Sequence, residues 1–222
     1  MSCIAEENAV VEGRLKPSMY QSKEANSMSE MMTHALKEWA IAVEALERGE
    51  TIVLLRKGGI RERGGKFTID RDRVLLYPTY EHQKPELLKP EYARKVTPVE
   101  SGWHPETVRI GSWAQITDIL PVGDRAAVSA LLPYHIWTDR LTEDRLKWKP
   151  QQPLYVLLLR VFRLAQVRQI PYREAYGGCR SWIELTDAIA IADSSPVLTE
   201  AEYRSRSQAV RDRLAEAVTP SP

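Results

Sequence analysis

Cysteine is scarce in this chain, whose 222 residues include only Cys3 and Cys179. The two lie far apart, and neither belongs to a group with the spacing that a zinc site requires. A disulfide framework and a cysteine metal site are therefore not supported, and we expect neither a metal nor a cofactor. Such cysteine usage is typical of the reduced cytoplasm, where we place the protein.

Long hydrophobic runs are also missing. No apolar stretch of the sequence approaches the roughly 20 residues that a membrane-spanning helix needs. The first residues include Glu6, Glu7 and Glu12, and they lack the basic start and apolar centre of a secretory signal. We expect a soluble protein that is not exported and has no membrane partner.

The sequence contains no complete catalytic motif. Between Gly59 and Phe67 the glycines and Lys66 are out of phase for a phosphate-binding loop, and Phe67 stands where a magnesium-binding hydroxyl belongs. No lysine has Asp or Glu two residues before it, as restriction-type nucleases usually do. A nucleophile elbow, zinc spacings and a dinucleotide fingerprint are absent too. The sequence leaves the question of enzymatic activity open.

Charge is unevenly distributed, although the formal net charge is +1. Residues 35–184 carry 24 Lys and Arg against 19 Asp and Glu, and each flank is acidic. The central part is thus mildly basic, which permits an anionic partner without requiring one.

The chain is long enough, and at 43% hydrophobic residues apolar enough, for one domain with its own core. We predict a disordered tail over residues 1–27 and a single α+β domain over 28–195. A C-terminal helix docked on the domain is predicted over 196–218, followed by a disordered end over 219–222.

Apolar periodicity predicts the individual elements. A helix from Ser29 to Gly49 follows from apolar residues at helical spacing, including Leu36 and Trp39. Strands are predicted over 51–56, 73–77, 110–120, 154–164 and 179–185, and a glycine-rich basic hairpin lies between the first two. Short helices are expected around 85–96, 125–132 and 143–148. Thr199 and Glu202 form a capping box before the last helix.

Two clusters of basic residues suggest a nucleic-acid surface. Seven Lys or Arg and no acid lie between Arg145 and Arg173, interleaved with aromatic residues such as Tyr155 and Tyr172. Cations beside flat aromatic faces are suited to holding phosphates and stacking bases. A second basic cluster, from Arg56 to Arg73, is diluted by acids. The alternative is a solvated surface over buried aromatic residues.

Glu81 and His82 are the best candidates for polar chemistry. A carboxylate beside an imidazole can orient it as a base or bind a metal. In an extended segment, however, adjacent side chains point to opposite faces. A structural histidine is therefore favoured over a catalytic one, because no third partner can be named.

Four motifs carry a family resemblance. The runs 35–40, 54–60, 77–83 and 178–182, the last reading Gly-Cys-Arg-Ser-Trp, together resemble a bacterial family named domain of unknown function number eighteen-oh-two. The resemblance covers roughly residues 33–186 and implies no activity. Some relatives are linked to a restriction-endonuclease-type domain, which implies a role in defence or DNA handling and a nuclease-type protein partner.

A weaker resemblance concerns the fold. The order of the motifs is similar to that of the ASCH members of the PUA-like superfamily. It consists of a helix, Gly49 seven residues before Arg56, the strand from Asp72 to Tyr77, the run 110–116 and the strand from Leu154. This resemblance implies a small β-barrel with flanking helices that binds RNA or modified bases. It also implies a cleft near Arg56, Lys57, Tyr80 and Glu81. Thr51 and Leu54 replace the lysine and threonine of the hydrolytic members, which favours binding over hydrolysis.

We therefore expect a module that binds RNA, DNA or a modified base. One alternative is an enzyme that acts on a nucleotide through Glu81 and His82, and another is an accessory subunit that docks through its C-terminal helix. Trp182 and Arg180 have a second interpretation as a core pair that closes the barrel. The predicted phosphate- or base-binding residues are Arg56, Lys57, Arg61, Tyr80, Arg160, Arg163, Arg180 and Trp182.

Overall fold

The computed structural model describes residues 30–57, 61–63, 66–68, 71–148, 150–178 and 180–218. For 61–63 and 66–68 it describes the backbone alone. The predicted disordered segments, 1–27 and 219–222, lie outside the described residues, so those two predictions stay predictions. No helix among the described residues is both long and apolar enough to cross a membrane.

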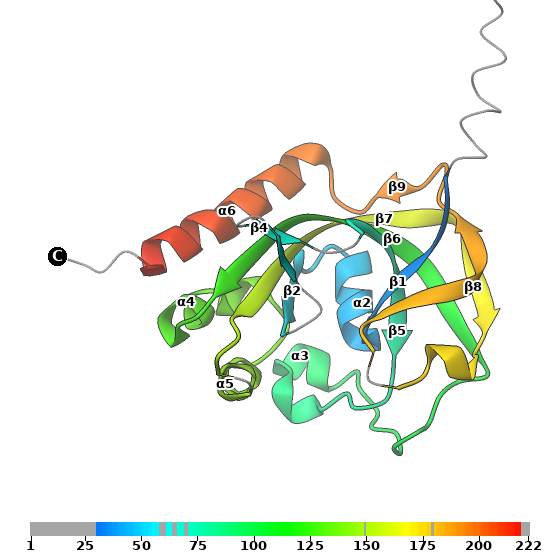
Figure 1. Ribbon diagram of the computed structural model, residues 1–222, viewed down its shortest axis with the longest axis horizontal. Helices are drawn as coiled ribbons and strands as arrows, with labels where there is room; N and C mark the ends of the chain where they lie inside the picture. Colours follow the sequence, from blue (N-terminus) through cyan, green and yellow to red (C-terminus); the bar gives the residue numbers. More distant parts are fainter. Residues whose placement is uncertain are drawn as a thin grey trace, which may run out of the picture. The chain divides into compact units, whose positions relative to one another are not determined.

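The domain is built on a mixed sheet of seven strands (Figure 1). Its strand order is β2-β7-β6-β5-β1-β8, and β9 pairs with β7 beside this path. All pairs are antiparallel except β1 with β5, which run parallel. The strands are β1 (Met31–Trp39), β2 (Val53–Arg56), β5 (Arg73–Thr79), β6 (Thr107–Val122), β7 (Leu154–Pro171), β8 (Trp182–Ala190) and β9 (Ser195–Pro196).

The α+β class is confirmed, but the predicted barrel is wrong because the sheet does not close. Among the described strands, β2 pairs with β7 alone and β8 with β1 alone, so each is an edge. Strand β2 has only four residues. After Arg56 the chain leaves the sheet for the short hairpin of β3 (Arg61–Arg63) and β4 (Lys66–Thr68). The described strands therefore form an open sheet that ends at β2 and β8.

The long ribbon of β6 and β7 forms the centre of the sheet. From Leu154 to Leu159 every residue of β7 is buried, because both faces of the strand are covered. Beyond Arg160 the strand becomes mostly exposed. The predicted strand over 154–164 is confirmed, and it continues to Pro171 because β6 pairs with it as far as Thr107.

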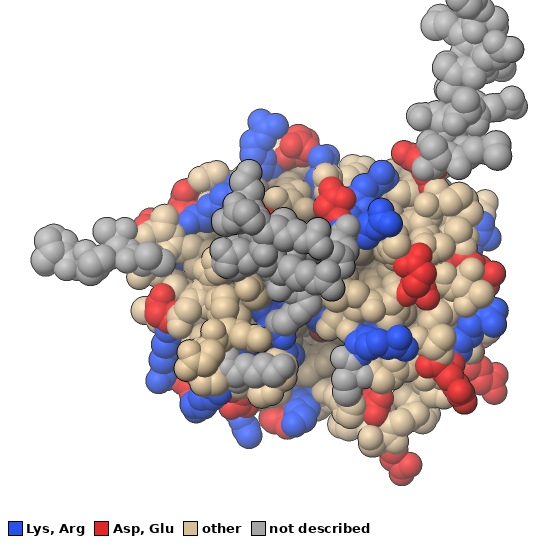
Figure 2. All heavy atoms as spheres, viewed as in Figure 1, with Lys and Arg blue, Asp and Glu red and all other residues tan. Residues whose placement is uncertain are grey.

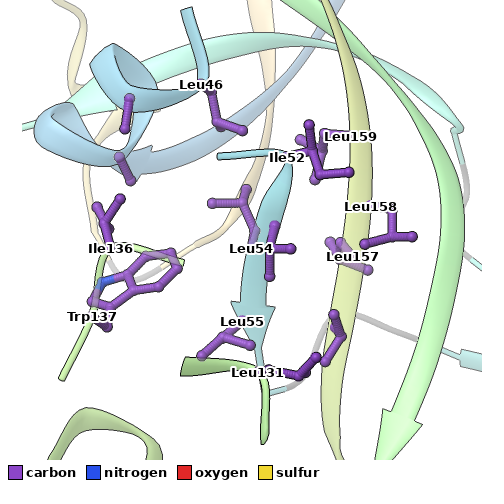
Figure 3. Close-up of a cluster of buried hydrophobic side chains, with 14 of the residues drawn as sticks. Leu46, Ile52, Leu54, Leu55, Leu131, Ile136, Trp137, Leu157, Leu158 and Leu159 are labelled. Atoms are coloured by element: carbon purple, nitrogen blue, oxygen red, sulfur yellow. The ribbon is translucent and has the colours of Figure 1, made fainter. Parts of the chain in front are cut away.

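The main core lies between this ribbon and helix α2 (Ala40–Glu47), around which the sheet curves in Figure 1. Figure 3 shows Leu46 of α2 and Leu54 of β2 beside the leucines of β7. Side chains such as Leu54 and Leu157 are fully buried. Burial of a leucine side chain contributes roughly 1.5–3 kcal/mol, so this cluster is a main source of stability.

The predicted helix from Ser29 to Gly49 is half wrong. Residues 31–39 form strand β1, and only residues 40–47 form helix α2. The apolar spacing fits both structures over so short a segment. Strand β1 forms because β5 and β8 satisfy its backbone on both sides, which outweighs local helical preference.

The remaining helices cover the sheet. The segment predicted as helical over 85–96 contains only the short η1 (Pro85–Leu87) and α3 (Pro90–Ala93). Helices α4 (Arg125–Ala130) and α5 (Asp139–Lys147), with η2 (Leu132–Tyr134), follow β6, and η3 (Glu174–Tyr176) follows β7. The C-terminal helix α6 (Glu200–Val218) buries Tyr203, Val210 and Leu214.

Candidate ligand-binding cleft

A cleft of about 550 Å³ opens beside the ends of β1 and β5. Its walls come from segments that are far apart in the sequence: the end of β1, the loop after β5, the loop before β6, helix α5 and the residues after β7. We call it the aromatic cleft. Its charged and aromatic lining residues are Lys37, Glu38, Trp39, Arg56, Tyr77, Tyr80, Glu81, His82, Trp103, His104, Arg145, Tyr172, Tyr176 and Arg180.

A buried ion pair forms the floor of the aromatic cleft. Arg56, the last residue of β2, donates from Nη1 to Oε2 of Glu38 over 2.6 Å. The two side chains are only 11% and 9% exposed. The other carboxylate oxygen of Glu38 accepts from the backbone N–H of Trp39. Strand alternation places Glu38 on the same face as the buried Leu36, which is why a charged side chain points inward here.

Arg145 of α5 is a second guanidinium at the same floor. It is half-buried, and no ion pair or hydrogen bond joins its side chain to another described residue. Burial lowers the pKa of Arg145, the positive charge of Arg56 lowers it further, and Glu38 partly offsets both. An arginine stays charged even so. Among the described residues, one carboxylate therefore lies beside two guanidinium groups, which leaves an excess positive charge at the floor.

Aromatic rings surround the mouth of the cleft. Tyr80 and Trp103 meet edge to face with their ring centroids 5.9 Å apart. His104 stacks on Tyr172 at 3.4 Å and nearly parallel. Trp103 remains 45% exposed, which is unusual for so large an apolar ring. The cleft thus offers flat faces next to a positive floor.

Two more cations hold the wall that follows β7. The ammonium group of Lys37 donates to the carbonyl oxygens of Tyr176 and Gly178, at 2.6 and 2.8 Å. Arg180 donates to the carbonyl oxygen of Ala175 at 2.7 Å. The contacts of Lys37 hold Tyr176 and Gly178 against β1. Lys37 and Arg180 therefore shape the cleft as well as charging it.

Glu81 and His82 line the rim of the cleft. Oε1 of Glu81 accepts from the backbone N–H of Gly102 at 2.6 Å and from the hydroxyl of Ser101 at 3.1 Å. The same oxygen lies 3.2 Å from Nε2 of His82. The bond from Gly102 is the main cause that lowers the pKa of Glu81. A carboxylate of low pKa with two donors already in place is a weak base, and this geometry favours a role in positioning the loop.

The other predicted site residues are spread over the molecule. Lys57 is buried outside the cleft, where its Nζ donates to the carbonyl oxygen of Leu146 and burial lowers its pKa. Arg160 pairs with Glu200 of α6 at 2.6 Å. The indole N–H of Trp182 is buried without a partner among the described residues. The side chain of Arg61 lies outside the described residues.

The basic run from Arg145 to Arg173 does not form one strip in the described part of the chain. Arg145 lies in the cleft, Arg160 pairs with Glu200, and Arg173 lies 3.6 Å from Asp187. Figure 2 shows Lys and Arg side chains interspersed with Asp and Glu over the face that it draws. Acids that follow the run in sequence, Glu200 and Asp187, thus lie against two of its arginines, which a count along the sequence does not reveal.

Sequence reasoning missed several residues of the cleft. Glu38 falls within the predicted helix from Ser29 to Gly49 and is not among its apolar residues, and Trp103 and His104 belong to no motif. Arg145 and Tyr172 belonged to the basic run, but nothing in the sequence brought them to Arg56. Among the described residues, no three His, Cys, Asp or Glu side chains gather in a way that would hold a metal ion.

The family of this chain follows from a match to a sequence-family model. The model described as "Domain of unknown function (DUF1802)" matches residues 35–209. The chain belongs to the DUF1802 family. The aromatic cleft of this DUF1802 protein, from Lys37 to Arg180, lies inside the matched residues. No protein of curated function matches the chain.

Several solved structures are similar to this DUF1802 chain, among them crystal structures of ASCH from Zymomonas mobilis. One has 14% sequence identity and a TM-score of 0.41, and the match covers 79% of this chain and 93% of that one. A serine-to-alanine variant of the same protein has 13% identity and a TM-score of 0.40, with 69% of this chain and 88% of that one covered. ASCH is the group named by the weaker sequence resemblance. A likeness at this level assigns no residue and no activity to the DUF1802 chain.

Proposed function

We propose that this protein is a nucleic-acid-binding module and that the aromatic cleft holds one nucleotide of the bound strand. In this proposal the phosphate contacts Arg145 and Arg56 at the floor. The base lies against the aromatic rings at the mouth, where Tyr80 and Trp103 offer their faces. The cleft volume of about 550 Å³ is in the range usual for small ligands.

The environment of Arg145 is the main observation that supports the proposal. A guanidinium group that is half-buried, lies near another guanidinium and forms no ion pair with the described residues raises the energy of the unliganded protein. A phosphate supplies two or more acceptor oxygens and neutralises the surplus charge. Stacking on aromatic rings adds roughly 1–3 kcal/mol per base and is tolerant of base identity.

The test is a binding titration with a labelled single-stranded RNA of about ten nucleotides, at low and at moderate salt. We expect affinity to fall as salt rises, because each neutralised phosphate releases counterions. Arg145→Gln should weaken binding about tenfold or more. The matched control is Arg140→Gln, which removes an exposed arginine from the same helix and should change affinity less than twofold.

Stability separates this role of Arg145 from a structural one. Arg145→Gln removes a charge that burial disfavours and Arg56 repels, which together exceed the attraction of Glu38, so the variant should unfold at an equal or higher temperature. No binding of RNA or DNA by the wild-type protein at low salt would refute the proposal. Equal binding by Arg145→Gln and Arg140→Gln would also refute it.

An enzyme that acts on a nucleotide is a second candidate, and the contact between Glu81 and His82 on the rim supports it. Under this alternative Glu81→Gln abolishes turnover of a bound nucleotide while the affinity persists. If Glu81 only positions the loop at Gly102, the same variant weakens binding and no turnover is found in either protein. Incubation of RNA and free nucleotides with both proteins decides between these outcomes.

A further inference from the structure

A second cavity, of about 680 Å³, adjoins the aromatic cleft. It lies between α2, the segment 95–99 and the β6–β7 ribbon. We call it the basic cavity. Pro78, Tyr80 and Trp103 line both cavities. The edge-to-face pair of Tyr80 and Trp103 is therefore a partition between two hollows rather than the outer wall of one.

Cations outnumber acids in the basic cavity. Its lining includes four cations, Arg48, Lys95, Arg109 and Arg163, and two acids, Glu44 and Glu47. Arg109 pairs with the carboxylate of Glu47 at 2.8 Å, whereas Arg163 donates to the backbone carbonyl of Glu47. The side chain of Arg109 is 47% exposed, so a phosphate can reach its free face. The carboxylate of Glu47 is only 14% exposed, so the phosphate contacts the outer face of Arg109 while this pair stays in place.

Trp103 faces both cavities and is 45% exposed. A nucleobase that stacks on its free surface would cover apolar area that water now contacts. Bases become available to such a ring when they are unstacked, as in a single strand. The partition thus favours a single strand over a duplex.

We propose that a single strand of nucleic acid crosses the partition of Tyr80 and Trp103, so that two successive nucleotides occupy the aromatic cleft and the basic cavity. This inference rests on the proposed function and names its substrate class as a single strand of at least two nucleotides. The connecting phosphate passes over the partition. The cations of the basic cavity contact the second nucleotide and do not contact a lone mononucleotide in the aromatic cleft.

Affinity as a function of ligand length tests the inference. Adenosine 5′-monophosphate, a dinucleotide, an eight-nucleotide single strand and a duplex of the same sequence are titrated against the wild-type protein. We expect at least tenfold tighter binding of the dinucleotide than of the mononucleotide. The single strand should also bind at least tenfold more tightly than the duplex.

Substitutions of residues that line the basic cavity provide a second test of the inference. Lys95→Ala removes a cation whose nearest carboxylate, that of Glu44, is 3.8 Å away. It should weaken single-strand binding about fivefold or more and leave mononucleotide affinity unchanged. Arg109→Ala should act in the same direction, and Arg204→Ala on α6, which lines neither cavity, is the control. Trp103→Ala should lose affinity that Trp103→Phe recovers.

The outcomes distinguish this inference from the proposed function. If the wild type binds the mononucleotide and the longer ligands equally, and Arg145→Gln abolishes both, the aromatic cleft stands and the inference is overturned. Unchanged single-strand affinity in both Lys95→Ala and Arg109→Ala overturns it as well. If the wild type binds none of these ligands, the proposed function itself fails.

Discussion

Glu38 is the residue on which the floor of the aromatic cleft depends. Its carboxylate contacts Arg56 directly and offsets the charge of Arg145. We predict that Glu38→Gln destabilises the protein by about 3 kcal/mol, because removal of one member of a buried pair leaves uncompensated charge. Urea denaturation measures the loss.

A double variant is the control for this prediction. Arg145→Gln removes one of the two guanidinium groups that Glu38 serves, so it should recover part of the stability lost in Glu38→Gln. Additive effects of the two substitutions would show that Arg145 and Glu38 do not interact. Whether the double variant is more or less stable than Glu38→Gln alone thus tests the charge balance that we assign to the floor.

His82 adopts a left-handed backbone conformation, with φ at 65°. Asparagine adopts this conformation readily, whereas a β-branched residue is strained there. We predict that His82→Asn leaves stability within about 1 kcal/mol of wild type and leaves RNA affinity intact, while His82→Val costs about 1–2 kcal/mol. Thermal unfolding and the RNA titration check both parts. Loss of function in His82→Asn with normal stability would instead support an acid-base role for the imidazole.

At the scale of elements, α6 is part of the fold through both its cap and its apolar face. Thr199 and Glu202 form the capping box that the sequence predicts, with Glu202 accepting from the backbone N–H of Thr199 at 2.8 Å. We predict that Thr199→Ala costs about 1 kcal/mol of unfolding free energy, measured with urea. Ser205→Ala, at an exposed position of the same helix, is the control and should be near neutral. Equal effects of the two substitutions would contradict the cap.

The position of α6 also bears on how a docking role is tested. Tyr203 is buried and its hydroxyl bonds to that of Thr117 at 2.5 Å, while Arg211 forms a two-bond pair with Asp118. Deletion of residues 198–222 would therefore remove core packing together with any docking surface. Substitution of exposed residues such as Arg204 tests docking without this side effect.

The sequence predicts those elements whose signal is local. The strands at 51–56, 73–77, 110–120 and 154–164 are confirmed, because three of them are apolar or β-branched runs and 110–120 alternates in character. Strand β1 was missed because its pairing with β5 and β8 is a tertiary effect. The open sheet was missed for a related reason, since element order does not reveal whether two edges meet.

The cleft is predicted only in part for the same reason. Arg56, Tyr80, Glu81, His82 and Arg180 were named from the sequence and do line it. Glu38, Trp103 and Arg145 were not placed there, because they reach the cleft through β1, the loop before β6 and α5. Arg160 was named for its place in a basic run, but Glu200 lies against it across the fold. The sequence alone does not show which distant residues become neighbours in the fold.

At the scale of the whole molecule, a buried histidine links stability to pH. His135 is 2% exposed, and burial is the main cause that lowers its pKa to about 4 from 6.5. The unfolded chain then binds a proton more readily than the folded protein between these values. We predict that stability is full above about pH 6.5 and falls by about 3 kcal/mol as pH drops to 4.

Urea denaturation across this pH range measures the effect of His135. His135→Gln removes the titrating group, so the difference in stability between the wild type and this variant should shrink as the pH falls from 6.5 to 4. A constant difference over the range would assign the acid sensitivity to other groups. Carboxylates lose their charge mainly at the lower end of this range. They do so in both proteins, so the difference between the wild type and His135→Gln isolates the effect of His135.

The pairing of β1 with β8 has a consequence for how the protein is made. These strands join Thr33 to Glu184, which are 151 positions apart, and the floor and walls of the cleft come from both ends of that interval. During translation β1 cannot pair with β8 until nearly the whole domain has left the ribosome. Long-range pairing of this kind folds slowly, over milliseconds to seconds. An incomplete nascent chain therefore has no cleft, and under the proposed function it binds RNA only after synthesis of the domain is finished.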